Sequence, residues 1–121
     1  KKILIVEDEK SIAEALKKVF VAEGFIVSIA KDGVDGLKQA KKMNPDLMLL
    51  DIIMPKLDGI TMLQKMRKEA WGKDIKVMIL TNLSGEKELM NALESGVHDY
   101  LIKADWSLKD VVKRIKERLA I

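Results

Sequence analysis

With 121 residues, the chain is long enough to form one domain with its own core, without disulfides or bound metals to hold it together. It contains no cysteine, which excludes a disulfide framework, a thiolate metal site and a cysteine nucleophile. We therefore expect a single domain over residues 1–121 in a reducing compartment, the cytoplasm. No apolar run approaches membrane-spanning length and no signal-peptide pattern is present, so we expect no membrane association.

The formal net charge of +3 is compatible with an acidic partner such as nucleic acid. However, the excess lysines are spread through helical segments and mixed with acids, and only 4% of residues are aromatic. Few side chains are thus available to stack on bases. We interpret the charge as a solvated lysine surface and expect no direct contact with nucleic acid.

Short apolar runs alternate with helical periodicities along the chain. The runs are rich in Ile, Leu and Val and have the length of strands buried on both faces. The third run ends before Pro55 and has Asp51 at its C-terminal edge. The predicted strands cover 3–6, 25–30, 47–54, 76–81 and 99–102. The predicted helices cover about 11–20, 32–43, a segment starting at 58–59, 84–94 and 107–119.

Local signals predict where these helices begin and end. Ser11 with Glu14 matches a capping box for the first helix, although a start one turn earlier also fits, and Asp32 is the predicted N-cap of the second. Gly24 and Asn44 are predicted to close these two helices. Residues predicted to face the core are Val34, Leu37 and Ala40 in the second helix, Leu63 and Met66 in the third, and Leu108, Val111, Val112, Ile115 and Leu119 in the last.

The repeated alternation of strand and helix, with short connections, predicts an α/β fold with a parallel sheet covered by helices on both faces. Right-handed crossovers and a buried first strand favour the strand order 2-1-3-4-5 of a doubly wound, flavodoxin-like (βα)5 three-layer sandwich. In that order the first strand lies beside the third. Ligands in such folds bind where the strand order reverses, at the carboxyl edge of the sheet.

Side chains that can take part in catalysis or metal binding lie at the C-terminal ends of four predicted strands. Glu7 and Asp8 follow the first strand, Asp51 lies in the third, Thr81 ends the fourth, and Lys103 follows the fifth. Each has an ordinary alternative explanation when taken alone, as a helix N-terminal acid, a strand-end hydroxyl or one half of a charge pair. Because parallel strands end at one edge, all five are expected to meet, and together they form a candidate site.

The chemistry of these residues suits phosphoryl transfer. Three crowded carboxylates repel each other unless protonated or bound to a cation, and Mg²⁺ is a hard, oxygen-binding ion that retains several waters. A carboxylate such as that of Asp51 can attack phosphorus to give an aspartyl phosphate. The Lys103 ammonium and the Thr81 hydroxyl could then bind further oxygens of the transferred group.

Four segments resemble the motifs of the receiver domain of two-component response regulators, the family of the chemotaxis receiver. The resemblance covers residues 2 to about 119. The motifs are Ile-Leu-Ile-Val-Glu-Asp at 3–8, Asp-Ile-Ile-Met-Pro-Lys-Leu-Asp-Gly at 51–59, Thr81, and Gly-Val-His-Asp-Tyr-Leu-Ile-Lys at 96–103.

The resemblance implies a role for each matching residue. Asp51 is the implied phosphoacceptor and Lys103 the phosphate-binding lysine. Thr81 and Tyr100 are the implied switch pair. The ligands implied for Mg²⁺, with Mn²⁺ as an alternative metal, are Glu7, Asp8, Asp51 and the backbone carbonyl of Ile53.

The resemblance also implies partners. The phosphoryl donor would be a phosphohistidine on a sensor histidine kinase or phosphotransfer protein. Phosphorylation adds roughly −1.5 to −2 charges, which can draw the Thr81 hydroxyl inward and let the Tyr100 ring turn. The surface of the fourth helix, fifth strand and fifth helix would then change, for an output protein or a homodimer. Such a domain is a signalling switch that catalyses only its own phosphorylation and dephosphorylation, not an enzyme with a separate substrate.

Four positions depart from the family pattern. Lys103 is followed by Ala104 where the family usually has proline, which leaves its peptide geometry open, and Trp106 either fills the resulting gap or anchors a partner. Asn82 replaces a usually small residue and would narrow access to Asp51. Apolar Ile53 and Leu83 lead us to predict slow self-dephosphorylation.

Three alternatives to a phosphorylatable receiver remain. A pseudo-receiver would keep the fold and bind partners without phosphate. A flavodoxin-like cofactor binder is disfavoured because no glycine-rich phosphate loop follows the first strand. A phosphatase with an aspartyl nucleophile usually has a second acid two residues later, where this chain has Ile53.

Overall fold

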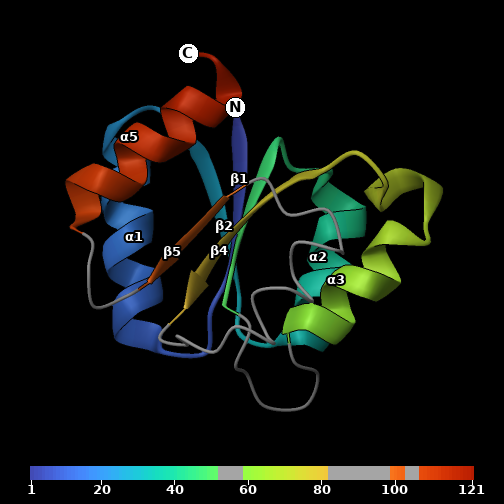
Figure 1. Ribbon diagram of the computed structural model, residues 1–121. Coiled ribbons are helices and arrows are strands. Elements are labelled where there is room, and N and C mark those ends of the chain that lie inside the picture. The colour runs from blue at the N-terminus through green and yellow to red at the C-terminus, as the bar shows by residue number, and fades with distance from the viewer. Residues whose placement is uncertain (52–58, 82–98, 103–106) are drawn as a thin grey trace.

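The computed structural model describes residues 1–51, 59–81, 99–102 and 107–121, with only the backbone described at 81 and 99–102. Its strands form one parallel sheet in the predicted order, β2-β1-β3-β4-β5 (Figure 1). The predicted helix over 84–94 lies outside the described residues. The strands are β1 (Lys2–Val6), β2 (Ile26–Ala30), β3 (Leu47–Leu50), β4 (Lys76–Thr81) and β5 (Asp99–Ile102). The helices are α1 (Lys10–Ala22), α2 (Gly33–Met43), α3 (Gly59–Arg67), the 3-10 turn η1 (Ala70–Gly72) and α5 (Leu108–Leu119).

Helices cover both faces of the sheet, α1 and α5 on one side and α2 and α3 on the other (Figure 1). Successive residues of a strand point to opposite faces, and both faces of β1 and β3 are buried. Thus the same four-residue runs contribute to two separate cores. On the α2–α3 side lie Leu4, Val6, Met48, Leu50, Met62, Leu63 and Met66. On the α1–α5 side lie Ile3, Ile5, Leu16, Phe20, Leu47, Leu49, Val111 and Ile115.

Helix α1 begins earlier than the predicted capping box. Its N-cap is Glu9, whose side chain makes no capping hydrogen bond, so Ser11 lies inside the helix and the Ser11–Glu14 prediction is wrong. The end of the helix agrees with the prediction. Gly24 has a φ of +93°, and across it the N–H of Phe25 donates to the carbonyl of Phe20 at 3.1 Å.

Helix α2 starts and stops as predicted, and Leu37 and Ala40 face the core as expected, but Val34 does not. The Asp32 carboxylate accepts from the N–H of Asp35 at 2.8 Å, and Asn44 ends the helix in the left-handed region. Val34, predicted to be buried, is 56% exposed. Gly36 faces the core instead, where an added Cβ would lie 3.1 Å from Val6 Cγ1. The absence of a side chain lets α2 pack close to the sheet, which turns Val34 outward.

The turn η1 has no counterpart among the elements predicted from the sequence. Its Gly72 lies so close to α3 that a Cβ would stand 2.4 Å from the Met66 carbonyl oxygen. Arg67 holds the turn by donating from a guanidinium nitrogen to the carbonyl of Gly72 at 2.8 Å. Partial burial of this guanidinium lowers the pKa of Arg67, while nearby Asp74 acts in the opposite direction. The half-buried ring of Trp71 packs onto the α2–α3 core.

Helix α5 has a complete capping box. Ser107 Oγ accepts from the N–H of Asp110 at 3.2 Å, and Asp110 accepts from the N–H of Ser107 at 3.1 Å. The predicted inward face is confirmed: Val111, Ile115 and Leu119 are buried. No helix among the described residues is both long enough and apolar enough to cross a bilayer.

Candidate functional site

Two backbone hydrogen bonds place acidic residues at the carboxyl edge of the sheet. The N–H of Glu7 donates to the carbonyl of Ala30 at 3.0 Å, and the N–H of Asp51 donates to the carbonyl of Val6 at 3.0 Å. Each bond continues the parallel ladder one residue past the end of a strand. The positions of Glu7 and Asp51 are therefore set by the central strands and not by a loose loop.

Strand pairing explains why Glu7 and Asp51, which are 44 residues apart in the sequence, become neighbours. Val6 of β1 is paired with Leu50 of β3, so the residues that follow these two positions emerge side by side. β1 pairs with β2 on its other side, and the chain direction of the crossovers reverses between β1 and β3. This is the switch point predicted from the sequence, where open α/β sheets bind ligands.

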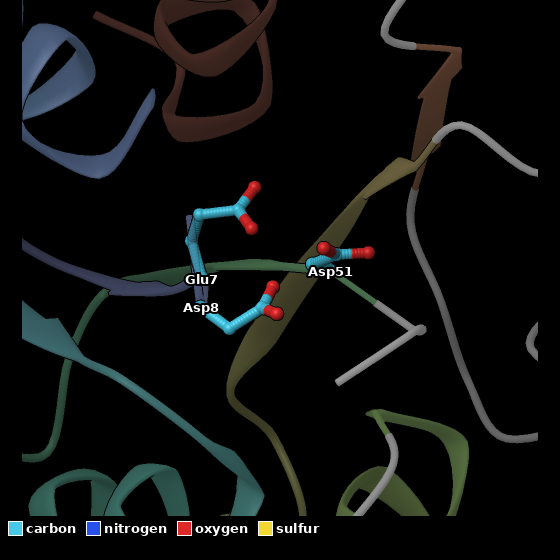
Figure 2. A group of neighbouring side chains, drawn as sticks. All are labelled: Glu7, Asp8 and Asp51. Atoms are coloured by element: carbon cyan, nitrogen blue, oxygen red, sulfur yellow. The ribbon is translucent and has the colours of Figure 1, made fainter. Parts of the chain in front are cut away.

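Three carboxylates meet there. Glu7, Asp8 and Asp51 each offer an oxygen, and these oxygens all lie within 4.8 Å of one another (Figure 2). Glu7 and Asp51 are buried, at 2% and 5% exposure, while Asp8 is exposed. Glu7 Oε2 also accepts from the N–H of Glu9 at 3.2 Å. Sequence reasoning misses this contact, because a backbone donor leaves no signature in the sequence.

The donor set fits a small, hard divalent cation. Carboxylate oxygens are the ligands preferred by Mg²⁺, which commonly binds through a few carboxylates and keeps several waters. Exposed Asp8 leaves the outer side of the cluster open to such waters, while buried Glu7 and Asp51 form its inner side. In addition, like charges this close repel each other, and a bound cation would remove that repulsion.

The other predicted site residues are located only in part. Thr81 is the last residue of β4 and is paired with Ile102 at the end of β5, so its backbone lies at the same edge of the sheet as the acidic cluster. Tyr100 is paired with Ile79, two residues back along β5. The predicted residues Ile53, Lys103 and Trp106 lie outside the described residues, as do the departures at Asn82, Leu83 and Ala104.

A family model for the response regulator receiver domain matches residues 3–116. The chain belongs to this family. The match covers both strands that bear the acidic cluster and most of α5. The resemblance identified from the sequence motifs is therefore confirmed, and the chain is a receiver domain of the kind used in two-component signalling.

Related proteins agree with this assignment. The response regulator MprA of Mycobacterium leprae is 32% identical over 118 residues, which cover 98% of this chain and 50% of that protein. The receiver domain thus spans about half the length of the curated relatives it matches. A CheY-like receiver domain protein from Methanospirillum hungatei has a TM-score of 0.92 at 29% identity, covering 99% of this chain and 94% of the other.

A third relative bears on the metal. The receiver domain of sensor histidine kinase PA1611 from Pseudomonas aeruginosa has a TM-score of 0.87 at 25% identity, covering 100% of this chain and 98% of the other. That structure has a magnesium ion coordinated in the active site cleft. The fold of this chain is therefore shared with a receiver in which Mg²⁺ binds.

Proposed function

We propose that this receiver domain is a signalling switch that accepts a phosphoryl group on Asp51 from a phosphohistidine of a sensor histidine kinase or phosphotransfer protein. The observation that supports it best is the cluster of Glu7, Asp8 and Asp51 oxygens within 4.8 Å at the carboxyl edge of the sheet. An aspartate that merely ends a strand would not be expected to have two further carboxylates beside it. We also propose a cytoplasmic location, in keeping with a chain that contains no cysteine.

The proposed transfer is a single displacement at phosphorus. A carboxylate oxygen of Asp51 forms a bond to phosphorus as the bond from phosphorus to the donor's imidazole nitrogen breaks, and the imidazole leaves with the electron pair of that bond. The ladder hydrogen bond from the N–H of Asp51 to Val6 fixes the backbone of the nucleophile. Such fixation lowers the cost of orienting the carboxylate for attack.

Glu7, Asp8 and Asp51, with the carbonyl of Ile53, are the proposed ligands of Mg²⁺ or Mn²⁺. When bound, the ion would offset the negative charge of the carboxylates and of the phosphoryl oxygens. Lys103 and Thr81 are proposed to bind the remaining phosphoryl oxygens. Thr81 ends β4 at this edge of the sheet, and Lys103 directly follows the last residue of β5, Ile102.

The proposed output is a change in the surface formed by the predicted fourth helix, β5 and α5. In the phosphorylated state the Thr81 hydroxyl moves toward the phosphoryl group and Tyr100 turns into the space that it leaves. The pairing of β4 with β5 brings the backbones of these two residues onto adjacent strands. A partner, or a second copy of the chain, that prefers one arrangement would convert phosphorylation into a signal.

Mass spectrometry after incubation with acetyl phosphate and Mg²⁺ tests the proposal. We expect a mass gain of one phosphoryl group that requires Mg²⁺ and is lost in Asp51→Asn. Asp46→Asn is the matched control, since Asp46 lies at the opposite edge of the sheet and should leave the gain intact. No gain with acetyl phosphate and none with a competent kinase would favour the pseudo-receiver, which binds partners without phosphate.

We further propose that the phosphoryl group is lost slowly, because Ile53 and Leu83 are apolar where polar side chains could orient a hydrolytic water. The decay of the phosphorylated species after removal of the donor measures this. A half-life of seconds would contradict the proposal. Ile53→Asn should shorten the lifetime if the apolar side chain is responsible.

A further inference from the structure

Helices α2 and α3 lie on the face of the sheet opposite α1 and α5 (Figure 1). A groove lies between α2 and the segment formed by α3 and η1. Its volume is about 430 Å³. The floor contains Leu37 and the half-buried Trp71, both of which pack onto the α2–α3 core. We refer to it as the tryptophan groove. A second hollow of about 630 Å³ shares Trp71 and Lys41 with it and continues past Ile75.

Four lysines form the sides of the tryptophan groove. Lys38 and Lys41 lie three residues apart on α2 and therefore share one side of that helix. Lys65, in the last turn of α3, and Lys68, directly after that helix, also line the groove. All four lysines are exposed, and none forms an ion pair with a carboxylate of the described residues.

The helix dipole accounts for only part of this charge. Cations are favourable in the last turn of a helix, which explains Lys41 in α2 and Lys65 in α3. It does not explain Lys38, which lies a turn earlier, nor Lys68, which lies beyond the last residue of α3. Four like charges around one groove repel each other, and among the described residues that line it Glu69 is the single acid.

The indole of Trp71 is the second unusual feature. It is one of only two tryptophans in the chain, and it sits where two concave regions meet. A partly exposed tryptophan with an apolar neighbour such as Leu37 provides contact area for an apolar side chain. Tryptophan is among the residues that most often supply binding energy at protein interfaces.

The groove lies away from the proposed phosphorylation site. α2 and α3 run antiparallel to the strands, so their last turns, with Lys41 and Lys65, lie toward the amino edge of the sheet (Figure 1). Asp51 lies at the carboxyl edge. The groove is therefore not part of that site.

We propose that the tryptophan groove binds an acidic polypeptide segment of a partner protein. The segment places an apolar side chain against Trp71 and Leu37, and its carboxylates pair with the lysines of the two walls. The positive charge of the lysines requires a negatively charged segment, and the apolar floor requires that the segment also carry an apolar side chain. A single-stranded nucleic acid fits less well, because such sites stack successive bases on several aromatic rings and the described lining of this groove has one.

A peptide-display selection tests the proposal with random sequences as the probe. Random peptides are selected on the wild-type chain after depletion on the Lys41→Glu/Lys65→Glu variant. We expect the enriched peptides to be acidic and to share a large apolar residue. Enrichment of neutral or basic peptides, or no enrichment beyond the depleted pool, would overturn the proposal.

Binding of one enriched peptide is then measured by the fluorescence of Trp71 in a Trp106→Phe background, where it is the only tryptophan. We expect its emission to shift on binding, and the affinity to fall by about tenfold or more in Lys41→Glu/Lys65→Glu. Lys17→Glu/Lys18→Glu on α1 is the matched control, with the same change in charge at exposed positions on the other face. It should change the affinity by less than about twofold.

Three results in this assay would overturn the proposal. An equal loss of affinity in the α1 control would show that the peptide responds to net charge and not to the groove. Tighter binding of a single-stranded thymidine oligonucleotide, abolished in Lys41→Glu/Lys65→Glu, would assign the groove to nucleic acid. No shift in Trp71 emission on binding would place the peptide elsewhere on the surface.

Discussion

The amino edge of the sheet fastens its charged groups to the backbone, whereas the carboxyl edge brings like charges together. At the amino edge the N–H of Lys2 donates to Asp46 Oδ2 at 2.8 Å, and Lys2 Nζ donates to the carbonyl of Met43 at 3.2 Å. On the same edge Lys76 Nζ donates to the carbonyl of Arg118 at 2.8 Å. At the carboxyl edge Glu7, Asp8 and Asp51 lie within 4.8 Å of one another.

The difference shows how one sheet serves stability at one edge and function at the other. Each contact at the amino edge joins the start of a strand to a segment more than 40 residues away in the sequence, and so holds the fold. Three carboxylates this close repel one another, and a bound cation would relieve that repulsion. Functional sites commonly keep such unfavourable groups, because the ligand that relieves them then binds more tightly.

The largest expected effect is a stabilisation by Mg²⁺ that depends on the carboxyl edge alone. At a free Mg²⁺ concentration of roughly one hundred times its dissociation constant, binding to the folded state adds about 2.7 kcal/mol to the free energy of unfolding. We expect this gain in the wild type and its loss in Asp8→Asn at the same concentration. Urea denaturation with and without Mg²⁺ measures both.

Asp46→Ala is the matched control for the metal experiment, because it removes a carboxylate from the amino edge. It should keep the full Mg²⁺ response although its starting stability is lower. An equal response in Asp8→Asn and the wild type would contradict the assignment of the metal to the carboxyl edge. Loss of the Mg²⁺-dependent stabilisation in Asp46→Ala would mean that this stabilisation does not depend on the carboxyl edge alone.

The next largest effect is expected from Gly72→Ala at the amino edge. A Cβ there would lie 2.4 Å from the Met66 carbonyl oxygen, so the backbone of η1 or α3 must move. We expect a loss of about 2 kcal/mol in the free energy of unfolding, with the Mg²⁺ response retained. Lys73→Ala, at the next and exposed position, should stay within about 0.5 kcal/mol of the wild type. A similar small change in Gly72→Ala would refute the steric argument.

A third prediction is that replacing an aspartate by alanine changes the free energy of unfolding in opposite directions at the two edges. Asp8→Ala removes repulsion that, at 4.8 Å, is about 0.9 kcal/mol per pair even at the dielectric constant of water. After loss of the favourable helix-dipole contribution, we expect a gain of about 0.5–1 kcal/mol without Mg²⁺. Asp46→Ala removes a hydrogen bond to Lys2, and we expect a loss of about 0.5–1 kcal/mol.

Denaturation at low and high salt measures this pair of effects. Both differences should shrink at high salt, since exposed charges are screened. A loss of stability in Asp8→Ala at low salt would mean that the three carboxylates are not under repulsion.

The sheet and the acidic cluster could be predicted because both follow from strand order. Apolar runs locate β1 and β3, the crossover rule makes them neighbours, and the residues after Val6 and Leu50 then have to meet. No side-chain detail is needed for this step. The predicted roles of Lys103 and Ile53 depend on such detail and remain predictions.

The failures have local physical causes. Val34 is the expected core residue because it is more apolar than Gly36, but α2 packs closer with the glycine inward. Ser11 matches a cap by its spacing to Glu14, yet α1 begins at Lys10 after Glu9. The turn η1 is too short for any periodicity, and its position depends on the contact of Gly72 with α3. The sequence pattern therefore does not identify Trp71, on the floor of the tryptophan groove.

The smallest expected effect concerns Asp110. Hydrogen bonds stabilise its carboxylate, whereas the carboxylates of Glu7, Asp8 and Asp51 lie close to one another. The hydrogen bonds from the backbone and side chain of Ser107 lower the pKa of Asp110 below its usual value. A carboxyl group whose pKa is lower in the folded state stabilises the fold above its unfolded-state pKa, and loses that contribution as pH falls through the folded-state value. The difference in the free energy of unfolding between the wild type and Asp110→Asn should therefore be constant at neutral pH and shrink below about pH 4.

Urea denaturation from pH 7 to pH 2 measures this difference, with Glu117→Gln in the last turn of α5 as the control. Because Glu117 lies at the other end of the helix from the capping box, its substitution should produce no comparable loss of advantage in this range. If the difference in the free energy of unfolding between the wild type and Asp110→Asn stays constant down to pH 2, the negative charge of Asp110 does not contribute to the capping box. The contrast in charge between Asp110 and the three clustered acids would then have no effect on stability.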